Sequence, residues 1–324
     1  MILVLRALGV GDLATGVPAL RALRRAFPSD ELVLAAPAWL TPLITLIGGV
    51  DRILPTPGLG PASWPIDAPS LAVNLHGSGP ESHRMLLDAR PGKLWGFRSE
   101  VHADGPDWVV EEHEVPRWCR MLGYYGIVAD PADLRLAAPD GPKGLTIVHP
   151  GAKSASRRWP VSRYAAVARR LRDAGHTVVV TGSASEREVA GRVAAEAGLD
   201  ASAVPATDLG ELAGMVAHAR VVISGDTGIS HVATAYGTPS VTLFGPMSPA
   251  YWGPPADRPW HRAIWHGTRS ERGDLPGEQV HPALLQVGVE EVLDAAAAAL
   301  ARSADQQPSV PELVPGAATI HPGR

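Results

Sequence analysis

The 324-residue sequence contains a single cysteine, Cys119, which excludes an internal disulfide. A chain without paired cysteines fits a reducing compartment and not a secreted disulfide scaffold. The most apolar stretch, residues 39–50, is interrupted by a proline and two threonines and is shorter than the ~20 residues that span a bilayer. The first residues lack the basic region of a signal peptide. We therefore expect a cytoplasmic protein with at most peripheral membrane contact.

Metal-binding and nucleic-acid-binding patterns are also scarce. The chain has no Asp-x-Asp pair, no His-Glu-x-x-His and no Cys/His spacing of a zinc site, so we expect neither a metal ion nor a cofactor. It lacks the Walker lysine and the Gly-x-Ser-x-Gly elbow of many hydrolases. The formal net charge of -4 argues against nucleic acid as a partner, although a local basic cluster can still bind a phosphate.

Short apolar runs alternate with amphipathic segments, a pattern typical of stacked strand and helix units. A stretch of low hydrophobicity with three prolines, residues 130–143, separates two such series. We therefore predict an α/β fold with two Rossmann-like domains, residues 1–140 and 144–288. A ligand cleft should lie between them at the carboxyl ends of the strands. We expect a helix at 289–302 and, at 303–324, a tail without its own fold.

The same patterns give the predicted elements. Strands are expected at residues 1–6, 31–36, 51–54, 71–75, 145–149, 177–181, 221–224 and 240–244. Helices are expected at residues 13–27, 112–125, 163–174, 186–197, 209–219 and 228–236, with a kink or a late start at Pro18.

The first chemical motif is Gly9-Val10-Gly11-Asp12, directly after the first strand. It fits a dinucleotide fingerprint loosely, but the acid expected about 20 residues further on, at the end of the second strand, is missing. Asp12 stands where a helix N-cap stands, and it also places a carboxylate on a cleft loop, able to take a proton from a hydroxyl. The motif alone leaves both interpretations open.

Two further motifs follow strands of the second series. Residues 149–160 hold Lys153, Arg157 and Arg158 between a strand and a helix, and such cations bind phosphate oxygens, although a solvated connection is also compatible. Residues 224–231 combine two glycines and a threonine at a helix N-terminus, which is an anion site by geometry and partial charge. His231, in the helix that follows, is compatible with a ligand contact or with a structural role.

Taken in order, these segments resemble glycosyltransferase family 9, the ADP-heptose:lipopolysaccharide heptosyltransferases. The resemblance covers about residues 1–300. Its segments are Gly11-Asp12, Thr15-Gly16-Val17-Pro18-Ala19-Leu20, Arg157-Arg158-Trp159-Pro160, Gly225-Asp226-Thr227-Gly228-x-x-His231, Gly237-x-Pro239, Phe244-Gly245-Pro246 and Trp252-Gly253-Pro254. The resemblance implies a GT-B fold with the acceptor on the first domain, the nucleotide sugar on the second, and the last helix returning toward the first. It further implies metal-independent transfer of a sugar, heptose from ADP-heptose, with inversion at the anomeric carbon.

The resemblance also implies residue roles. Asp12 resembles the general base, Arg157 stands where a basic residue holds the diphosphate, and Glu186 matches the acid that grips the ribose. The donor-sugar loop resembles residues 226–228, with His231 in support. Together with the second motif, the predicted donor-binding residues are Lys153, Ser154, Arg157, Arg158, Glu186, Asp226, Thr227, Gly228 and His231.

The acceptor is expected to carry a hydroxyl, and a glycolipid, a surface glycan and a natural product all stay open. Acceptor contacts are expected from His76, Ser78 and His83, in a loop after the fourth predicted strand, and from Arg117, although a solvated loop is equally compatible. We expect a monomer. Two other functions stay open: a sugar-nucleotide 2-epimerase with the same two-domain architecture, and a protein that binds a nucleotide sugar without catalysis.

Overall fold

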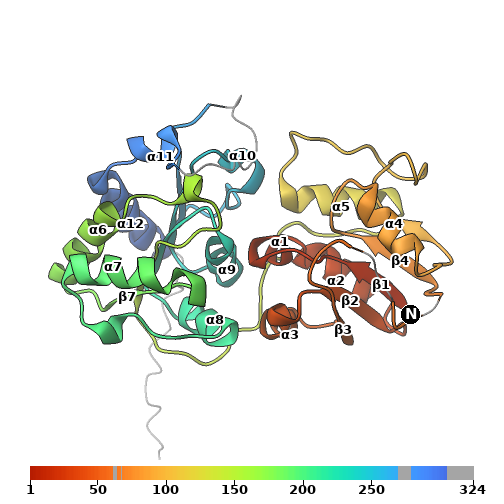
Figure 1. The fold of residues 1–324 in the computed structure, drawn as a ribbon, viewed down its shortest axis with the longest axis horizontal. Coiled ribbons are helices and arrows are strands. Elements are labelled where there is room, and N and C mark those ends of the chain that lie inside the picture. Colours follow the sequence, from red (N-terminus) through yellow and green to blue (C-terminus); the bar gives the residue numbers. More distant parts are fainter. Residues whose placement is uncertain (61–63, 67, 269–278, 305–324) are drawn as a thin grey trace, which may run out of the picture.

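The computed structural model describes residues 1–60, 64–66, 68–268 and 279–304. Two α/β halves lie side by side, the first from red to orange and the second from green to blue in Figure 1. Each half contains one parallel sheet of five strands with helices packed around it. The predicted α/β class with two Rossmann-like units is therefore confirmed. The exact boundary near residues 140–144 stays a prediction.

The first sheet has the strand order β3-β2-β1-β4-β5. Its strands are β1 (Ile2–Leu5), β2 (Leu32–Ala36), β3 (Arg52–Pro55), β4 (Leu71–Asn74) and β5 (Leu94–Trp95). The central strands β1, β2 and β4 are buried along their whole length, as the unbroken apolar runs predict for a parallel sheet covered on both faces. In register, Ile2 pairs with Leu32 on one side and with Leu71 on the other.

The helices of the first half are short. They are α1 (Val10–Thr15), α2 (Val17–Ala26), α3 (Thr41–Ile47), α4 (Glu81–Leu87) and α5 (Glu114–Tyr124), with a 3-10 turn at Ala38–Leu40. The single helix expected from residue 13 to 27 is two helices, because the chain breaks at Gly16 and restarts with Pro18 in the first turn of α2. This is the late start predicted for Pro18.

The second sheet has the order β10-β9-β8-β6-β7. Its strands are β6 (Thr146–His149), β7 (Val178–Val180), β8 (Val221–Gly225), β9 (Ser240–Leu243) and β10 (His261–Ile264). Its helices are α6 (Val161–Asp173), α7 (Arg187–Ala197), α8 (Leu209–Ala217), α9 (Gly228–Tyr236), α10 (Pro249–Trp252), α11 (Pro282–Gln286) and α12 (Val289–Ala304). The sequence analysis did not predict β10, α10 or α11.

The last helix corrects one expectation. The predicted helix exists as α12, but it packs on α6 and on strands β8, β9 and β10 of the second half instead of returning toward the first. Val292, Ala296 and Ala299 form a buried stripe on α12 that faces this sheet. Their small side chains let the helix lie close to the strands. Of the predicted tail, Ser303 and Ala304 end α12, and residues 305–324 lie outside the described residues.

The two halves meet along a shared apolar seam. Helix α1 packs on α9, and α3 packs on α8, in the middle of the view of Figure 1. One continuous cluster of buried side chains joins Leu13 and Leu43 of the first half with Val216 and Ile229 of the second. The seam brings the beginnings of α1 and α9 to the same place.

Candidate functional site

Both parallel sheets have a topological switch point, where the connections from two neighbouring strands run to opposite sides of the sheet. Ligands of open α/β sheets bind at this point, at the carboxyl ends of the strands. In the first sheet the switch lies between β1 and β4, which are followed by Asp12 and by His76. In the second sheet it lies between β6 and β8, which are followed by Arg157 and by Asp226. The predicted loops therefore occupy the two positions where this architecture places ligands.

Asp12 lies inside α1 and is not its N-cap, which corrects the expectation from sequence. The helix begins two residues earlier, at Val10, with Gly9 as its extended N-cap. The Asp12 carboxylate accepts a hydrogen bond from the Gly9 N–H at 3.1 Å through Oδ2. A glycine followed by valine starts this short helix early, so the carboxylate occupies the third helical position and closes the first turn.

Below α1 lies Arg6, a fully buried arginine that the sequence analysis did not single out. Its guanidinium donates to the carbonyl oxygens of Asp12 and Leu75 and, at 3.0 Å, to Thr15 Oγ1. It lies 3.6 Å from Glu114 Oε1 and 4.9 Å above the ring of Trp118. Burial lowers the pKa of Arg6, and the charge of Glu114 opposes that shift. Arg6 thus ties the end of β4 and helix α5 to the turn that carries Asp12.

His76 lies beside this group, at the end of β4. Its Nδ1 accepts a hydrogen bond from the Ala7 N–H at 3.2 Å, so the ring proton is on Nε2. Burial and the nearby charge of Arg6 lower the pKa of His76 to about 4, against the opposing effect of Asp12. The imidazole is therefore neutral near pH 7. Ser78 is partly buried in the same loop, and its hydroxyl approaches the Gly79 carbonyl at 3.4 Å.

The N-terminus of α9 comes directly against the N-terminus of α1. A Cβ built on Gly228 would lie 2.6 Å from Val10 Cβ, and one on Gly11 would lie 2.9 Å from His231 Cδ2. These two glycines let the backbones of the two halves approach closely. Burial lowers the pKa of His231 to about 4, Asp12 opposes this shift, and His113 and Arg157 add to it. His231 is thus neutral near pH 7 and lies within the electrostatic reach of Asp12.

The loop before α9 contains polar atoms without a protein partner. Among the described residues, the buried hydroxyls Ser224 Oγ and Thr227 Oγ1 have no hydrogen-bond partner. Asp226 is buried and accepts from Arg157, whose NH1 lies 3.3 Å from Asp226 Oδ2 and 3.3 Å from its carbonyl oxygen. A buried hydroxyl without a hydrogen-bond partner costs free energy of folding, so these two hydroxyls are suited to bind a ligand.

The remaining donor residues lie along the same edge of the second sheet. Lys153 and Arg158 are exposed, and the Arg158 Nε donates to the Ala152 carbonyl at 2.9 Å. Ser154 Oγ is 2.7 Å from the hydroxyl of the buried Ser156. The long cationic side chains are therefore at the surface, where an anion can reach them.

Glu186 follows β7 and closes a capping box. Its Oε2 accepts from the Ser183 N–H at 2.9 Å and from the Ser183 hydroxyl at 2.7 Å. Burial disfavours the charged carboxylate, but the two Ser183 hydrogen bonds, together with the charges of His149 and Arg158, outweigh it and lower the pKa of Glu186. His149, a buried residue that the sequence analysis did not assign, lies 4.0 Å from the same oxygen and holds the Thr181 hydroxyl at 2.9 Å through Nδ1. The structure thus shows the helix-end role of Glu186.

Two of the expected acceptor residues are not at the cleft surface. His83 is fully buried, with Nδ1 2.9 Å from Ser99 Oγ and its ring 5.2 Å from that of His102. Arg117 is also buried; it pairs with Glu114, donates to the Glu112 carbonyl at 2.7 Å and lies over the ring of Trp108. Both side chains therefore hold the first half together, because α4 and α5 bury the faces on which they lie.

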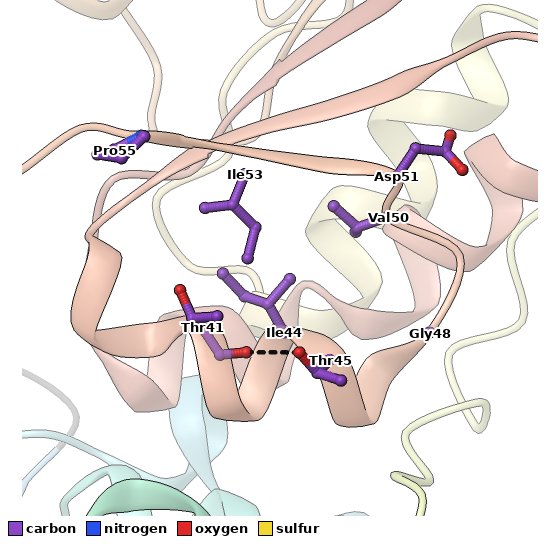
Figure 2. A pocket seen from close by; sticks show the side chains of 8 residues that line it. All are labelled: Thr41, Ile44, Thr45, Gly48, Val50, Asp51, Ile53 and Pro55. Carbon is purple, nitrogen blue, oxygen red and sulfur yellow. Dashed lines mark hydrogen bonds between the residues drawn. The ribbon is translucent and has the colours of Figure 1, made fainter.

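His113 is a further residue that the sequence analysis missed: it lies in the helix expected at 112–125, whereas the structure makes it the N-cap of α5. It caps α5 by accepting from the Val115 N–H at 3.2 Å, and its Nε2 lies 2.9 Å from the Gly253 carbonyl oxygen. This hydrogen bond links the first half to the Trp252-Gly253-Pro254 segment of the second. A cavity of about 380 Å³ elsewhere, between α3 and β3, contains none of the predicted site residues (Figure 2). Its Ile44 and Ile53 face each other across the hollow.

In the part of the chain that the structure describes, no three His, Cys, Asp or Glu residues are grouped as metal ligands. In that same part, each helix is too short or too polar to cross a membrane.

The architecture is shared with proteins of more than one activity. A Listeria monocytogenes protein described as a UDP-N-acetylglucosamine 2-epimerase has a TM-score of 0.53 and 11% identity, covering 94% of this chain and 90% of that one. This likeness concerns the fold alone and does not favour the epimerase alternative.

Sequence comparison gives a narrower result. Residues 124–272 match the model of glycosyltransferase family 9 (heptosyltransferase). Lipopolysaccharide heptosyltransferase 2 of Escherichia coli K12 is 25% identical over 339 residues, which cover 90% of this chain and 96% of that protein. The structure of the E. coli ADP-heptose lipopolysaccharide heptosyltransferase II has a TM-score of 0.71 and 21% identity, covering 94% of this chain and 99% of that one.

Proposed function

We propose that this chain, whose residues 124–272 match the model of glycosyltransferase family 9, transfers heptose from ADP-heptose to a hydroxyl of its acceptor, with inversion and without a metal ion. Relatives that are named heptosyltransferases and match most of the chain support a glycosyltransferase. The donor is proposed from the similar E. coli enzyme, whose name includes ADP-heptose. We further propose that the protein works in the reducing cytoplasm, which a single cysteine fits, and that it is a monomer.

One observation carries the proposal: the turn with Asp12 and the loop before α9 are in direct contact across the two halves. Gly11 and Gly228 form that contact, and His231 is the side chain between them. A carboxylate from one half is therefore next to a loop of the other half in which the hydroxyls of Ser224 and Thr227 have no protein partner. Transfer from a leaving diphosphate to a hydroxyl needs this combination of a base and positive partners.

The donor diphosphate is proposed to bind at the N-terminus of α9. Free backbone N–H groups there, with the hydroxyls of Ser224 and Thr227, donate to phosphate oxygens. Arg157 is already directed at this loop, and Lys153 lies on the same edge. The ribose would lie further along the edge, at Glu186.

In the proposed reaction Asp12 takes the proton of the acceptor hydroxyl. The hydroxyl oxygen forms a bond to the anomeric carbon from the face opposite the diphosphate, and the bond from that carbon to the phosphate oxygen breaks. ADP leaves with the electron pair, stabilised by Arg157 and the α9 N-terminus, so the anomeric configuration is inverted.

Replacing Asp12 with asparagine tests the base. Asparagine keeps an oxygen that can accept the Gly9 N–H, so folding and ADP affinity should stay unchanged while turnover falls by about 10²-fold or more. Asp30→Asn is the control, because Asp30 pairs with the chain N-terminus and should leave turnover unchanged. ADP release and calorimetry with ADP give the two readouts. If Asp12→Asn kept more than a tenth of wild-type turnover, Asp12 would have a structural role in α1 and not that of the base. If the wild-type protein bound ADP-heptose without transferring the sugar, it would be a binding protein.

Chelation and an arginine variant test the handling of the diphosphate. Activity should persist in excess EDTA, because cationic side chains take the role that a divalent ion has elsewhere. Arg157→Ala should weaken ADP binding by roughly 1.5–3 kcal/mol, about ten- to a hundredfold, whereas Arg170→Ala, which breaks an exposed pair with Glu290, should not. Activity that is lost with EDTA and restored by magnesium would contradict the metal-independent mechanism.

A further inference from the structure

A cavity of about 490 Å³ opens between the two halves, behind the contact of α1 and α9. The first half contributes Thr15 of α1 and the beginning of α5, and the second half contributes α9, α10 and residues 253–258. Its volume is in the range of pockets that hold small organic ligands. A ligand there would touch both halves at once.

The walls of this cavity are apolar. Five prolines take part in the lining, together with two aliphatic side chains and four alanines. These residues are Pro116, Pro131, Pro249, Pro254, Pro255, Val115, Leu134, Ala14, Ala132, Ala250 and Ala256. Such walls pack well against the faces of rings and against aliphatic groups, and they offer no hydrogen bonds from their side chains.

Most polar side chains of the wall already bond to the protein. Both ring nitrogens of His113 are used, by Val115 N–H and by the Gly253 carbonyl. The Thr234 hydroxyl donates to the Ser230 carbonyl at 3.0 Å. Arg258 donates to the Thr234 carbonyl at 3.0 Å and to the Ala132 carbonyl at 3.1 Å. A ligand body rich in hydroxyls would therefore lose its bonds to water and gain few in return.

Two polar side chains of this wall are exceptions, the exposed Asp257 and His231. Among the described residues no hydrogen bond reaches its ring, and its nearest ring partner is Trp252, with centroids 5.8 Å apart. The ring also touches Gly11 of the Asp12 turn. One polar group of a bound molecule can thus meet a neutral imidazole at the point where the cavity approaches the proposed base.

We infer that this cavity holds the body of the acceptor, and that the acceptor is a compound with an apolar ring system and a hydroxyl, not a bare sugar. The inference rests on the proposed function. The hydroxyl points past His231 toward Asp12, and its oxygen displaces ADP from the anomeric carbon while its proton passes to Asp12. Specificity comes from the proline walls, and both halves must be in contact for the acceptor to bind.

The experiment uses 4-methylumbelliferone, a fluorescent ring compound with one hydroxyl, and methyl glucoside as the bare sugar. Ala250→Trp places a large ring at the cavity from an exposed position of α10, and Ala256→Trp does so from the neighbouring exposed loop. Ala201→Trp, exposed on the same half and outside the lining, is the matched control. Binding is followed by fluorescence without donor, ADP binding by calorimetry, and folding by thermal unfolding.

We expect the wild type and Ala201→Trp to bind the umbelliferone equally, with no competition from excess methyl glucoside. Each cavity variant that unfolds at the wild-type temperature should raise the dissociation constant at least about tenfold and leave ADP affinity unchanged. Absence of umbelliferone binding, equal binding by both cavity variants, or displacement by methyl glucoside would overturn the inference. The proposed function would fail separately, by absent ADP binding or by full turnover in Asp12→Asn.

Discussion

Replacing Gly228 with alanine tests the contact on which the site depends. The added Cβ would lie 2.6 Å from Val10 Cβ, 2.8 Å from Val10 Cγ1 and 3.2 Å from the Gly11 nitrogen. Cβ and N belong to the rigid part of α1, so rotation of a side chain cannot relieve the clash. Overpacking of this kind costs about 1–3 kcal/mol.

The strain acts on the contact between the two halves, because Val10 begins α1 of the first half and Gly228 begins α9 of the second. If the halves separate to relieve it, the population with Asp12 beside the donor loop falls by about five- to a hundredfold, at tenfold per 1.4 kcal/mol. We therefore expect Gly228→Ala to lower kcat/KM strongly and to lower the free energy of unfolding by at most the strain itself.

Gly191→Ala is the matched control, because Gly191 lies inside α7 and a Cβ there would meet no atom within 4 Å. That change should stabilise the protein by roughly 0.5–1 kcal/mol and leave turnover unchanged. Denaturant unfolding and steady-state kinetics on both variants give the comparison. A Gly228→Ala protein as stable and as active as Gly191→Ala would refute the argument that close approach of α1 and α9 forms the site.

Three more predictions follow from single contacts. Glu186→Ala should raise the ADP dissociation constant by about one to two decades. Glu211→Ala, the control, opens the equivalent capping box of α8 and should cost only ~1 kcal/mol of stability. Equal ADP affinity in both variants would make Glu186 structural. Arg6→Met should destabilise the protein by ~3 kcal/mol or more in denaturant unfolding, because it leaves the buried Glu114 with one cation fewer; a loss below ~1 kcal/mol would contradict this. Burial, and secondarily the charge of His102, lowers the pKa of His83 to about 4. Between about pH 6.5 and 4 the unfolded chain therefore binds more protons than the native one. The free energy of unfolding should fall as the pH drops through that window, by up to about 3 kcal/mol. His83→Gln should flatten the acid limb of the stability profile, and an unchanged slope would show that His83 does not titrate this way.

Local patterns in the sequence predicted the α/β class with two units and the loops of the site, but not β10, α10 or α11. Unbroken apolar runs such as Ile2–Leu5 marked buried parallel strands, and glycines after β1 and β8 marked the turns. Because the carboxyl ends of parallel strands lie on one edge, the turns also fixed which residues gather there. The pairing of Asp226 with Arg157, 69 positions apart, was not visible from spacing.

What the sequence did not predict depends on contacts between distant segments. His113 is the N-cap of α5, and its link to the second half comes from Gly253, 140 residues away. Helix α12 carries many alanines, so its small apolar stripe fits several surfaces, and the pattern could not decide which half it covers. His83 looked like a cleft residue because it follows β4, but in the first turn of α4 it lies on the buried face of that helix. The position of His83 along the chain predicted which loop it is near but not the direction of its side chain.

The buried cluster that joins Leu13 and Leu43 to Val216 and Ile229 has a consequence for the modularity of the enzyme. Either half produced alone would leave this apolar seam in water, and such surface promotes association. The chain should therefore melt in one cooperative transition and not in two. For the same reason, a chimera that exchanges one half between relatives must carry over the matching seam, because complementary packing there is a condition for a folded hybrid.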